Sequence, residues 1–240
     1  MKEVALPEKL KKSLGEFVTG IKEIYSSELI SVIIYGSAAS GEFIAKRSNV
    51  NLLVVLANTD IATLQKATGL IRKCKRCVPL FLTEKYITSS LDVFPVEFLD
   101  MQENHVTLDG RDILKDLKIE LNNLRFQCEQ ELKAKLIHLK QIYLNSNKDK
   151  AALREALFKY FTSVTHISRN LLRLKNRMPT GKKEDIFKGL AEDFKIDPAL
   201  WEKIWLAMNN KITVNNQDIE QIYGGFVKDL EKIVGIVDEM

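Results

Sequence analysis

The sequence predicts an α/β (α+β) layer, a mixed sheet with flanking helices, followed by an all-α antiparallel helical bundle. Up to about Gly110, apolar runs of strand length alternate with segments of helical spacing, which is typical of an α/β layer. After Gly110 no convincing strand pattern follows, and long segments carry apolar residues at three-to-four spacing. We therefore expect an α/β domain over residues 1–115 and a helical bundle domain over 116–240, each large enough to bury a core.

The elements expected in the first domain follow from apolar periodicity and from residues that start helices. The expected strands are apolar runs of β type: Leu29–Tyr35, Asn51–Ala57, Val78–Leu82 and a fourth within Val96–Asp100. The expected helices show helical spacing or begin at a capping residue: Pro7–Tyr25, Ala38–Phe43, Asn58–Lys75 and Thr83–Leu91. Because the second strand is apolar almost throughout, we expect both of its faces to be buried.

The second domain is expected to contain only helices joined by short connections. Helical spacing and start signals place them at Leu121–Leu144, Asp149–Lys175, Lys183–Phe194, Pro198–Met208 and Asn215–Val237. The Asp-Pro pair before the fourth of these helices is a good start signal, because proline suits the first helical turn.

Charge and hydropathy exclude several classes of protein. The net charge of +4, from 36 basic and 32 acidic residues, is too mild to indicate a nucleic-acid partner. No apolar run approaches the ~18 residues of a membrane span, and the charged start lacks the apolar region of a signal peptide. We expect a cytoplasmic protein without a membrane partner.

Three cysteines are too few for a disulfide framework. Cys74 and Cys77 form a C-x-x-C motif, but a structural zinc site needs four ligands and no second pair exists. The expectation is therefore ordinary reduced thiols near the end of a helix, with a thiol of lowered pKa beside Lys75 and Arg76 as the alternative.

The most informative motif joins the first two expected strands. The first strand ends in Gly36-Ser37, and after a spacer of eleven residues Asn49-Val50-Asn51 opens the second strand. A glycine lets the backbone turn sharply, and N–H groups at such a turn can hold a phosphate. Two residues separated by one position on a strand point to the same face, so Asn49 and Asn51 should lie side by side.

This frame resembles the signature of the nucleotidyltransferase superfamily, whose fold is like that of polymerase β. The family pattern is Gly-Ser, a spacer of nine to thirteen residues, then an acid, an apolar residue and a second acid. Such acids share Mg²⁺ ions that flank a transferred phosphoryl group. Here both acids are replaced by Asn49 and Asn51, which keep the geometry and the side-chain oxygens but lose both charges.

The rest of the chain resembles that superfamily in architecture. An α/β domain followed by a helical bundle is similar to the kanamycin-type and minimal nucleotidyltransferases. In such families a third acid lies on a later strand beside the first two. Glu97 is the best candidate for this third metal position and for a catalytic role, with Asp100 as an alternative; Glu97 could equally be an edge-strand charge that faces water.

The resemblance also implies a nucleotide-binding set consisting of Gly36, Ser37, Lys46 and Arg47. Arginine can pair bidentately with phosphate oxygens. The alternative is that Lys46 and Arg47 belong to a solvated loop and contact no ligand. Ser37 could donate to a phosphate or only cap the short helix that follows. We expect Gly36, Ser37, Asn49, Asn51 and Glu97 to converge on one cleft that faces the helical half.

Three functions from different classes are compatible with these residues. The favoured hypothesis is a nucleotidyltransferase-fold protein with a degenerate metal site, which has weak or no transfer activity and binds a nucleotide or a partner. One alternative is an active Mg²⁺-dependent enzyme that moves a nucleotidyl group from an NTP to a small molecule or macromolecule. The other is an interaction module that binds a protein partner through the helical bundle. Mg²⁺ is expected to bind weakly, and an NTP is the candidate ligand.

Overall fold

A four-stranded mixed sheet forms the centre of the first half of the chain. The computed structural model describes residues 6–41, 43–45, 48–147, 149–177 and 183–240. It divides into two units, Met1–Glu120 and Leu121–Met240. The elements of the first unit are, in order, α1 Glu8–Tyr25, the 3₁₀ turn η1 Ser26–Glu28, β1 Leu29–Tyr35, α2 Ser37–Ser40, β2 Val50–Leu56, α3 Ile61–Gln65, α4 Thr68–Lys73, β3 Cys77–Leu82, α5 Glu84–Ser89, α6 Pro95–Glu103 and β4 His105–Gly110.

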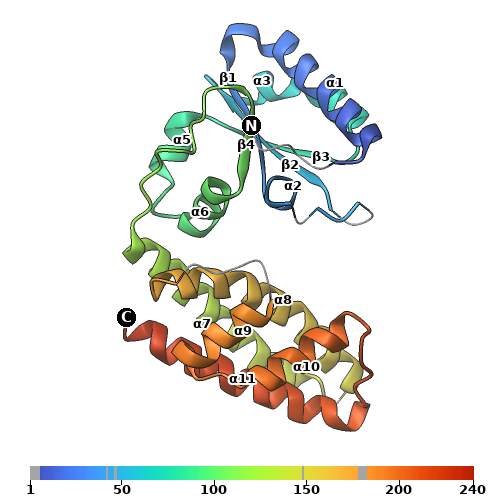
Figure 1. Ribbon diagram of the computed structural model, residues 1–240, viewed down its shortest axis with the longest axis vertical. Coiled ribbons are helices and arrows are strands. Elements are labelled where there is room, and N and C mark those ends of the chain that lie inside the picture. The colour runs from blue at the N-terminus through green and yellow to red at the C-terminus, as the bar shows by residue number, and fades with distance from the viewer. Residues whose placement is uncertain (1–5, 42, 46–47, 148, 178–182) are drawn as a thin grey trace. The chain divides into compact units, whose positions relative to one another are not determined.

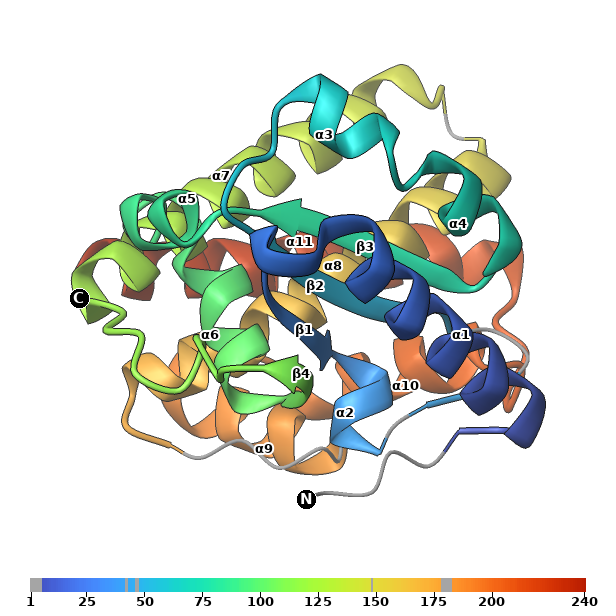
Figure 2. The same cartoon turned by 90° about the horizontal axis from the view of Figure 1, so that it is seen from above.

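The strands follow one another in the order β3-β2-β1-β4, as Figure 2 shows from above. Strand β1 runs antiparallel to both β2 and β4, whereas β2 and β3 are parallel. Parallel neighbours need a crossover connection, and α3 and α4 lie within it. The predicted mixed sheet with flanking helices is thus confirmed.

Both faces of the sheet are covered, because successive residues of each strand point to opposite sides. On one face, Val32, Ile34, Leu52 and Val54 belong to a core that includes the apolar side of α1. On the other face, the core consists of residues of β1, β2, α5, α6 and the segment after β4: Ile33, Leu53, Val55, Ile87, Phe98, Met101 and Leu114. Figure 1 shows α1 on one side of the strands and α5 and α6 on the other. This double burial explains the continuous apolar run of β2.

Two expectations about the first unit are wrong. Val96–Asp100 is not a strand but part of α6, which begins with Pro95 at its first position, where the missing N–H has no helical partner to lose. The fourth strand is instead His105–Gly110. The expected helix over 58–75 is also two short helices, α3 and α4, and Asp60 caps the first by accepting from the Thr63 N–H at 2.7 Å.

The regular elements among the described residues of the second unit are all helices, as predicted. Its helices are α7 Leu121–Asn145, α8 Lys150–Leu174, α9 Lys183–Phe194, α10 Pro198–Met208 and α11 Asn216–Asp238. Its core is built around Trp201, whose ring lies 5.3 Å from that of Phe161, 5.7 Å from Phe187 and 5.6 Å from Phe226, measured between centroids. These four aromatic side chains come from α8, α9, α10 and α11, so they tie four of the five helices together.

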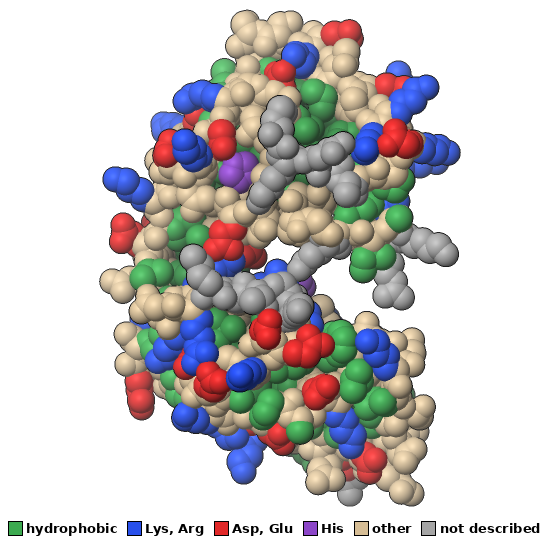
Figure 3. All heavy atoms as spheres, in the orientation of Figure 1, with side chains coloured by type: hydrophobic (Ala, Val, Ile, Leu, Met, Phe, Trp, Pro, Cys, Tyr) green, Lys and Arg blue, Asp and Glu red, His purple; other side chains and the backbone are tan. Residues whose placement is uncertain are grey.

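The surfaces carry charges of both signs. On the face drawn in Figure 3, basic and acidic side chains are intermingled, in keeping with the mild net charge of +4. None of the helices in the described part of the chain is long and apolar enough to cross a membrane.

Candidate functional site

The Gly-Ser turn at the end of β1 is the first part of the candidate site. Gly36 adopts φ +72° and ψ −146°, a conformation that essentially only glycine adopts. Its N–H donates to the Asn104 carbonyl at 3.0 Å, and its carbonyl accepts from the N–H groups of Ala39 and Ser40 in the helical turn that follows. A Cβ at this position would lie 3.3 Å from Nδ2 of Asn51. The glycine therefore allows the Asn51 carboxamide to lie directly against the turn.

The two asparagines occupy the start of β2. Asn51 is the register partner of Tyr35 on β1, which places it beside the residue that precedes the turn. Asn49 precedes β2 by one residue and is exposed, whereas Asn51 is half-buried. Neutral carboxamides thus stand where the resemblance implies carboxylates.

A row of residues crosses the sheet at this level, one from each strand. In sheet order the row is Val78, Asn51, Tyr35 and His105. Residues paired in register on neighbouring strands share a face, so Val78 lies next to Asn51 on the side away from Tyr35. Its side chain is 45% exposed and carries no ligand atom. The strand beside β2 therefore does not supply the third acid.

Glu97 does not lie in this row. It belongs to the first turn of α6 and is exposed, and the helix packs on the sheet through Phe98 and Met101 instead. Its predicted place on a strand beside Asn49 and Asn51 is wrong, because the segment is helical.

The residues of the row do not fit a Mg²⁺ site of the kind the resemblance implies. Mg²⁺ prefers carboxylate and other hard oxygen ligands in near-ideal octahedral geometry. Asn49 and Asn51 offer only neutral amide oxygens and Val78 offers none. Within the described ranges, no group of three or more His, Cys, Asp or Glu residues could hold a metal ion.

His105 adds a different kind of group to the row. Its Nδ1 lies 2.8 Å from the Gln102 carbonyl oxygen, and its Nε2 lies 3.0 Å from both carboxylate oxygens of Asp112. Because both partners are acceptors, both contacts are hydrogen bonds only in the doubly protonated ring. Burial acts to raise the pKa of the Asp112 carboxyl, but hydrogen bonds from His105, Lys115 and Leu114 together with the charge of His105 outweigh it, so this pKa lies below its ordinary value.

Arg76 fixes the segment that leads to Asn49. Its guanidinium donates to the carbonyl of Ala45 at 2.5 Å and to that of Ser48, and it lies 5.4 Å from the centre of the Phe43 ring. The Arg76 carbonyl also accepts from the Val50 N–H at 2.8 Å. Arg76 therefore positions the chain on both sides of Asn49. The two predicted phosphate ligands in this segment, Lys46 and Arg47, lie outside the described residues.

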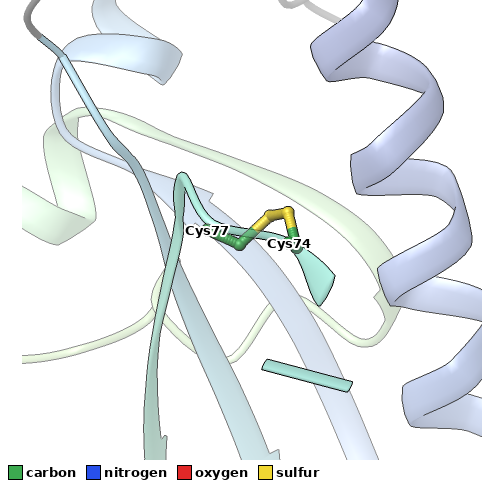
Figure 4. The surroundings of a disulfide bond; sticks show 2 residues. All are labelled: Cys74 and Cys77. Carbon is green, nitrogen blue, oxygen red and sulfur yellow. A yellow bond between two sulfur atoms is a disulfide. The ribbon is translucent and has the colours of Figure 1, made fainter. Parts of the chain in front are cut away.

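The C-x-x-C motif that contains Arg76 is closed by a disulfide. Cys74 follows α4 and Cys77 begins β3, with their Cα atoms 5.4 Å apart, and the bond joins them across the turn (Figure 4). Both belong to the core beneath α1. The expectation of reduced thiols is wrong for this pair, whereas Cys128 is a buried thiol outside this disulfide.

Three residues of the site escaped the sequence interpretation. Val78 lies beside Asn51 only because β3 pairs with β2, and no local sequence pattern indicates that pairing. In the sequence, Arg76 was considered only as a neighbour of Cys74 and Cys77. Its hydrogen-bond partners, Ala45 and Ser48, lie about thirty residues earlier in the chain. His105 could have been found from the alternation in His105–Gly110, a short strand signal that the longer apolar run before it concealed.

The sheet, the Gly-Ser turn and the helical second unit together define a nucleotidyltransferase-like fold. No protein-family model and no curated protein matches the sequence. Among solved structures, the chain is similar to spectinomycin adenyltransferase AAD(9) from Enterococcus faecialis, whose structure was determined with ATP and spectinomycin. The TM-score is 0.57 at 11% sequence identity, and the match covers 92% of this chain and 99% of that one. At this identity the likeness concerns the fold.

Proposed function

We propose that the first unit binds a nucleotide at the Gly36 turn without a divalent metal and does not transfer its nucleotidyl group. The observation that carries the proposal is the lack of acids at the positions where the resemblance implies them: Asn49 and Asn51 are amides, and Val78, the register partner of Asn51, is apolar. AAD(9), which shares the fold, was solved with ATP. Ser37, Lys46 and Arg47 remain predicted phosphate contacts.

Replacing acids with amides changes what the site can hold. A carboxylate and a phosphate about 4 Å apart repel each other by ~1 kcal/mol in water and by ~4 kcal/mol at an effective dielectric constant near 20. A metal ion removes that repulsion in an acidic site. A carboxamide needs no such ion, because its N–H can donate to a phosphate oxygen. The closeness of the Asn51 Nδ2 to the Gly36 turn supports this role.

The same replacement removes the groups that promote transfer. Assistance by a general base contributes typically ~10²–10⁴-fold, and paired metal ions stabilise the attacking and leaving oxygens in addition. Asn49, Asn51 and Val78 can supply neither effect. A bound nucleotide would therefore persist unchanged and act as a ligand.

Calorimetric titration with ATP, once with excess EDTA and once with Mg²⁺, tests the proposal. We expect the wild type to bind ATP equally well under both conditions and to show no nucleotidyl transfer. Asn49→Asp combined with Asn51→Asp should weaken binding in EDTA by at least about tenfold, because two charges then face the phosphates, and Mg²⁺ should restore much of it. Asn122→Asp, which makes the same change at an exposed position of α7, is the matched control.

Two results would contradict this function. Strictly Mg²⁺-dependent binding with turnover by the wild type would establish an active transferase. Absence of nucleotide binding in both buffers would leave the interaction module as the remaining hypothesis.

A further inference from the structure

Helix α7 has an apolar face on each side. Its buried side packs into the second unit through Leu124, Cys128, Leu132 and Leu139. The opposite side carries an exposed row of uncharged residues at intervals of four, four, three, four and three, which we name the outer stripe: Phe126, Gln130, Ala134, Ile137, Gln141 and Leu144. These intervals keep all six on one side of a helix.

The outer stripe exposes large apolar side chains that a solvated helix face does not need. Phe126 is 61% exposed, Ile137 57% and Leu144 79%. A helix with apolar residues on both sides is normally covered on both sides, and contiguous exposed apolar groups mark interaction sites. From Gln130 onward the intervals alternate four and three, which is the heptad spacing of residues at the seam of a two-helix contact.

We propose that the outer stripe is the contact between two copies of this chain, with the two α7 helices packed antiparallel about a two-fold axis near Lys135 and Leu136. The order of side chains along the stripe is self-complementary in this arrangement. Ala134 meets Ile137 of the second copy and Gln130 meets Gln141, while Phe126 lies within one residue of Leu144. Apolar groups thus oppose apolar groups and amides oppose amides, as an isologous interface requires. The paired residues extend over 18 positions, or about 27 Å of helix.

A hollow beside Leu144 gives the largest side chain of the stripe a place to insert. It has a volume of about 400 Å³ and lies between α7 and α11, lined by Lys140, Tyr143, Leu144, Tyr223, Gly224 and Val227. In the antiparallel arrangement, Phe126 of the second copy reaches this end of the helix. An exposed aromatic ring and an apolar hollow therefore occupy positions related by the same axis.

The charges along the flank do not oppose this contact. Lys133 is paired with Glu129 and Asp238, with N–O distances of 2.6 and 2.5 Å, and Lys140 is paired with Glu231 at 2.7 Å. The lysines that would approach each other across the axis thus each carry a carboxylate partner. The choice of a second copy as the occupant rests on this neutral flank and on the self-complementary order.

Sedimentation velocity of the full chain tests the proposal. We expect a concentration-dependent dimer for the wild type and at least ~100-fold weaker dimerisation for Ile137→Glu, because each dimer would bury two unpaired carboxylates. Ile61→Glu is the matched control, since Ile61 is 71% exposed on α3. A wild type that stays monomeric up to high micromolar concentration, or a dimer that survives Ile137→Glu, would overturn the proposal.

A second pair of variants tests the hollow. Gly224 and Gly235 both lie on α11 and are exposed, and an added Cβ at either meets no atom within 4 Å. Only Gly224 lines the hollow. Gly224→Leu should weaken the dimer by about tenfold or more, since it fills the space for Phe126, and Gly235→Leu should leave it unchanged. Equal effects of the two would contradict the insertion.

Cross-linking distinguishes the direction of the helices. When Gln130→Cys and Gln141→Cys proteins are mixed and oxidised, the antiparallel arrangement predicts a disulfide between the two variants and none within either variant alone. Self-linked Gln130→Cys would indicate parallel helices and refute the arrangement.

Discussion

Asp229 on α11 is a buried carboxylate that holds the start of α10 in place. It is 2% exposed and accepts hydrogen bonds from the N–H of Asp197 at 2.8 Å, from Nε1 of Trp201 at 3.2 Å and from Nζ of Lys232 at 2.7 Å. Asp197 is itself the N-cap of α10. Asp229→Ala should therefore destabilise the helical unit strongly, and Asp229→Asn should do so less.

The magnitude follows from the donors that the alanine leaves without an acceptor. Trp201 is fully buried, so its indole N–H cannot turn to water, and the Asp197 N–H donates to the same carboxylate oxygen. Losing each of these hydrogen bonds to a charged acceptor costs about 1–3 kcal/mol, so Asp229→Ala should lower the free energy of unfolding by about 2–6 kcal/mol. Lys232 is 37% exposed along its side chain and can reach solvent. Asp229→Asn keeps an acceptor oxygen and should cost about 1–2 kcal/mol.

Tryptophan fluorescence during urea unfolding measures this effect in the helical unit alone. The chain has two tryptophans, and both, Trp201 and Trp205, lie in α10. Glu231 on α11 has an exposed carboxylate and provides the control variant Glu231→Ala. Loss of this carboxylate should lower the free energy of unfolding by at most about 1 kcal/mol. If the free energies of unfolding of Asp229→Ala and Glu231→Ala differ by less than about 1 kcal/mol, the reasoning about the buried donors fails.

Two predictions concern the first unit. The lowered pKa of Asp112 contributes stability that is present above the unfolded value of about 3.9 and is lost as pH falls through the lower folded value. Asp112→Asn should therefore reduce the loss of stability at acid pH, measured by circular dichroism across that pH range. The same loss of stability in wild type and Asp112→Asn would contradict this. Gly110→Ala should cost at least about 3 kcal/mol in thermal unfolding, because at φ +76° its Cβ would lie 2.1 Å from the Ile30 carbonyl oxygen. Gly15→Ala in α1, with no atom within 4 Å, should instead be neutral or stabilising, and similar melting points for the two variants would refute this account.

The sequence allowed the central strands and the long helices to be predicted because their signals are local. The segment Leu29–Tyr35 is a strand over the predicted residues, and Lys183–Phe194 and Pro198–Met208 are helices over theirs. The fourth strand was misplaced because Val96–Asp100 alternates like a strand while Pro95 begins a helix there. Short apolar runs do not separate the two states, and packing against Ile33 and Leu53 decides the outcome.

The candidate site was predictable only where its residues are near one another in the sequence. Gly36 and Asn51 could be paired from spacing, and the structure places the Asn51 side chain against the Gly36 turn. The position of a third acid depends on which strand pairs with β2, and that pairing spans 27 residues between Asn51 and Val78. The search for an acid along the chain therefore selected Glu97, although the place beside Asn51 holds a valine.

The strand order also determines how this sheet meets other chains. An edge strand offers unpaired N–H and C=O groups on which another strand can add, and this is a common route to aggregation. One edge is β3, where Pro79 pairs in register with Leu52 and has no N–H to offer. The other edge is β4, whose register with β1 shifts at Val32 and Ile33. A proline on one edge and an irregularity beside the other both discourage strand addition, so the sheet is protected against growing from either end.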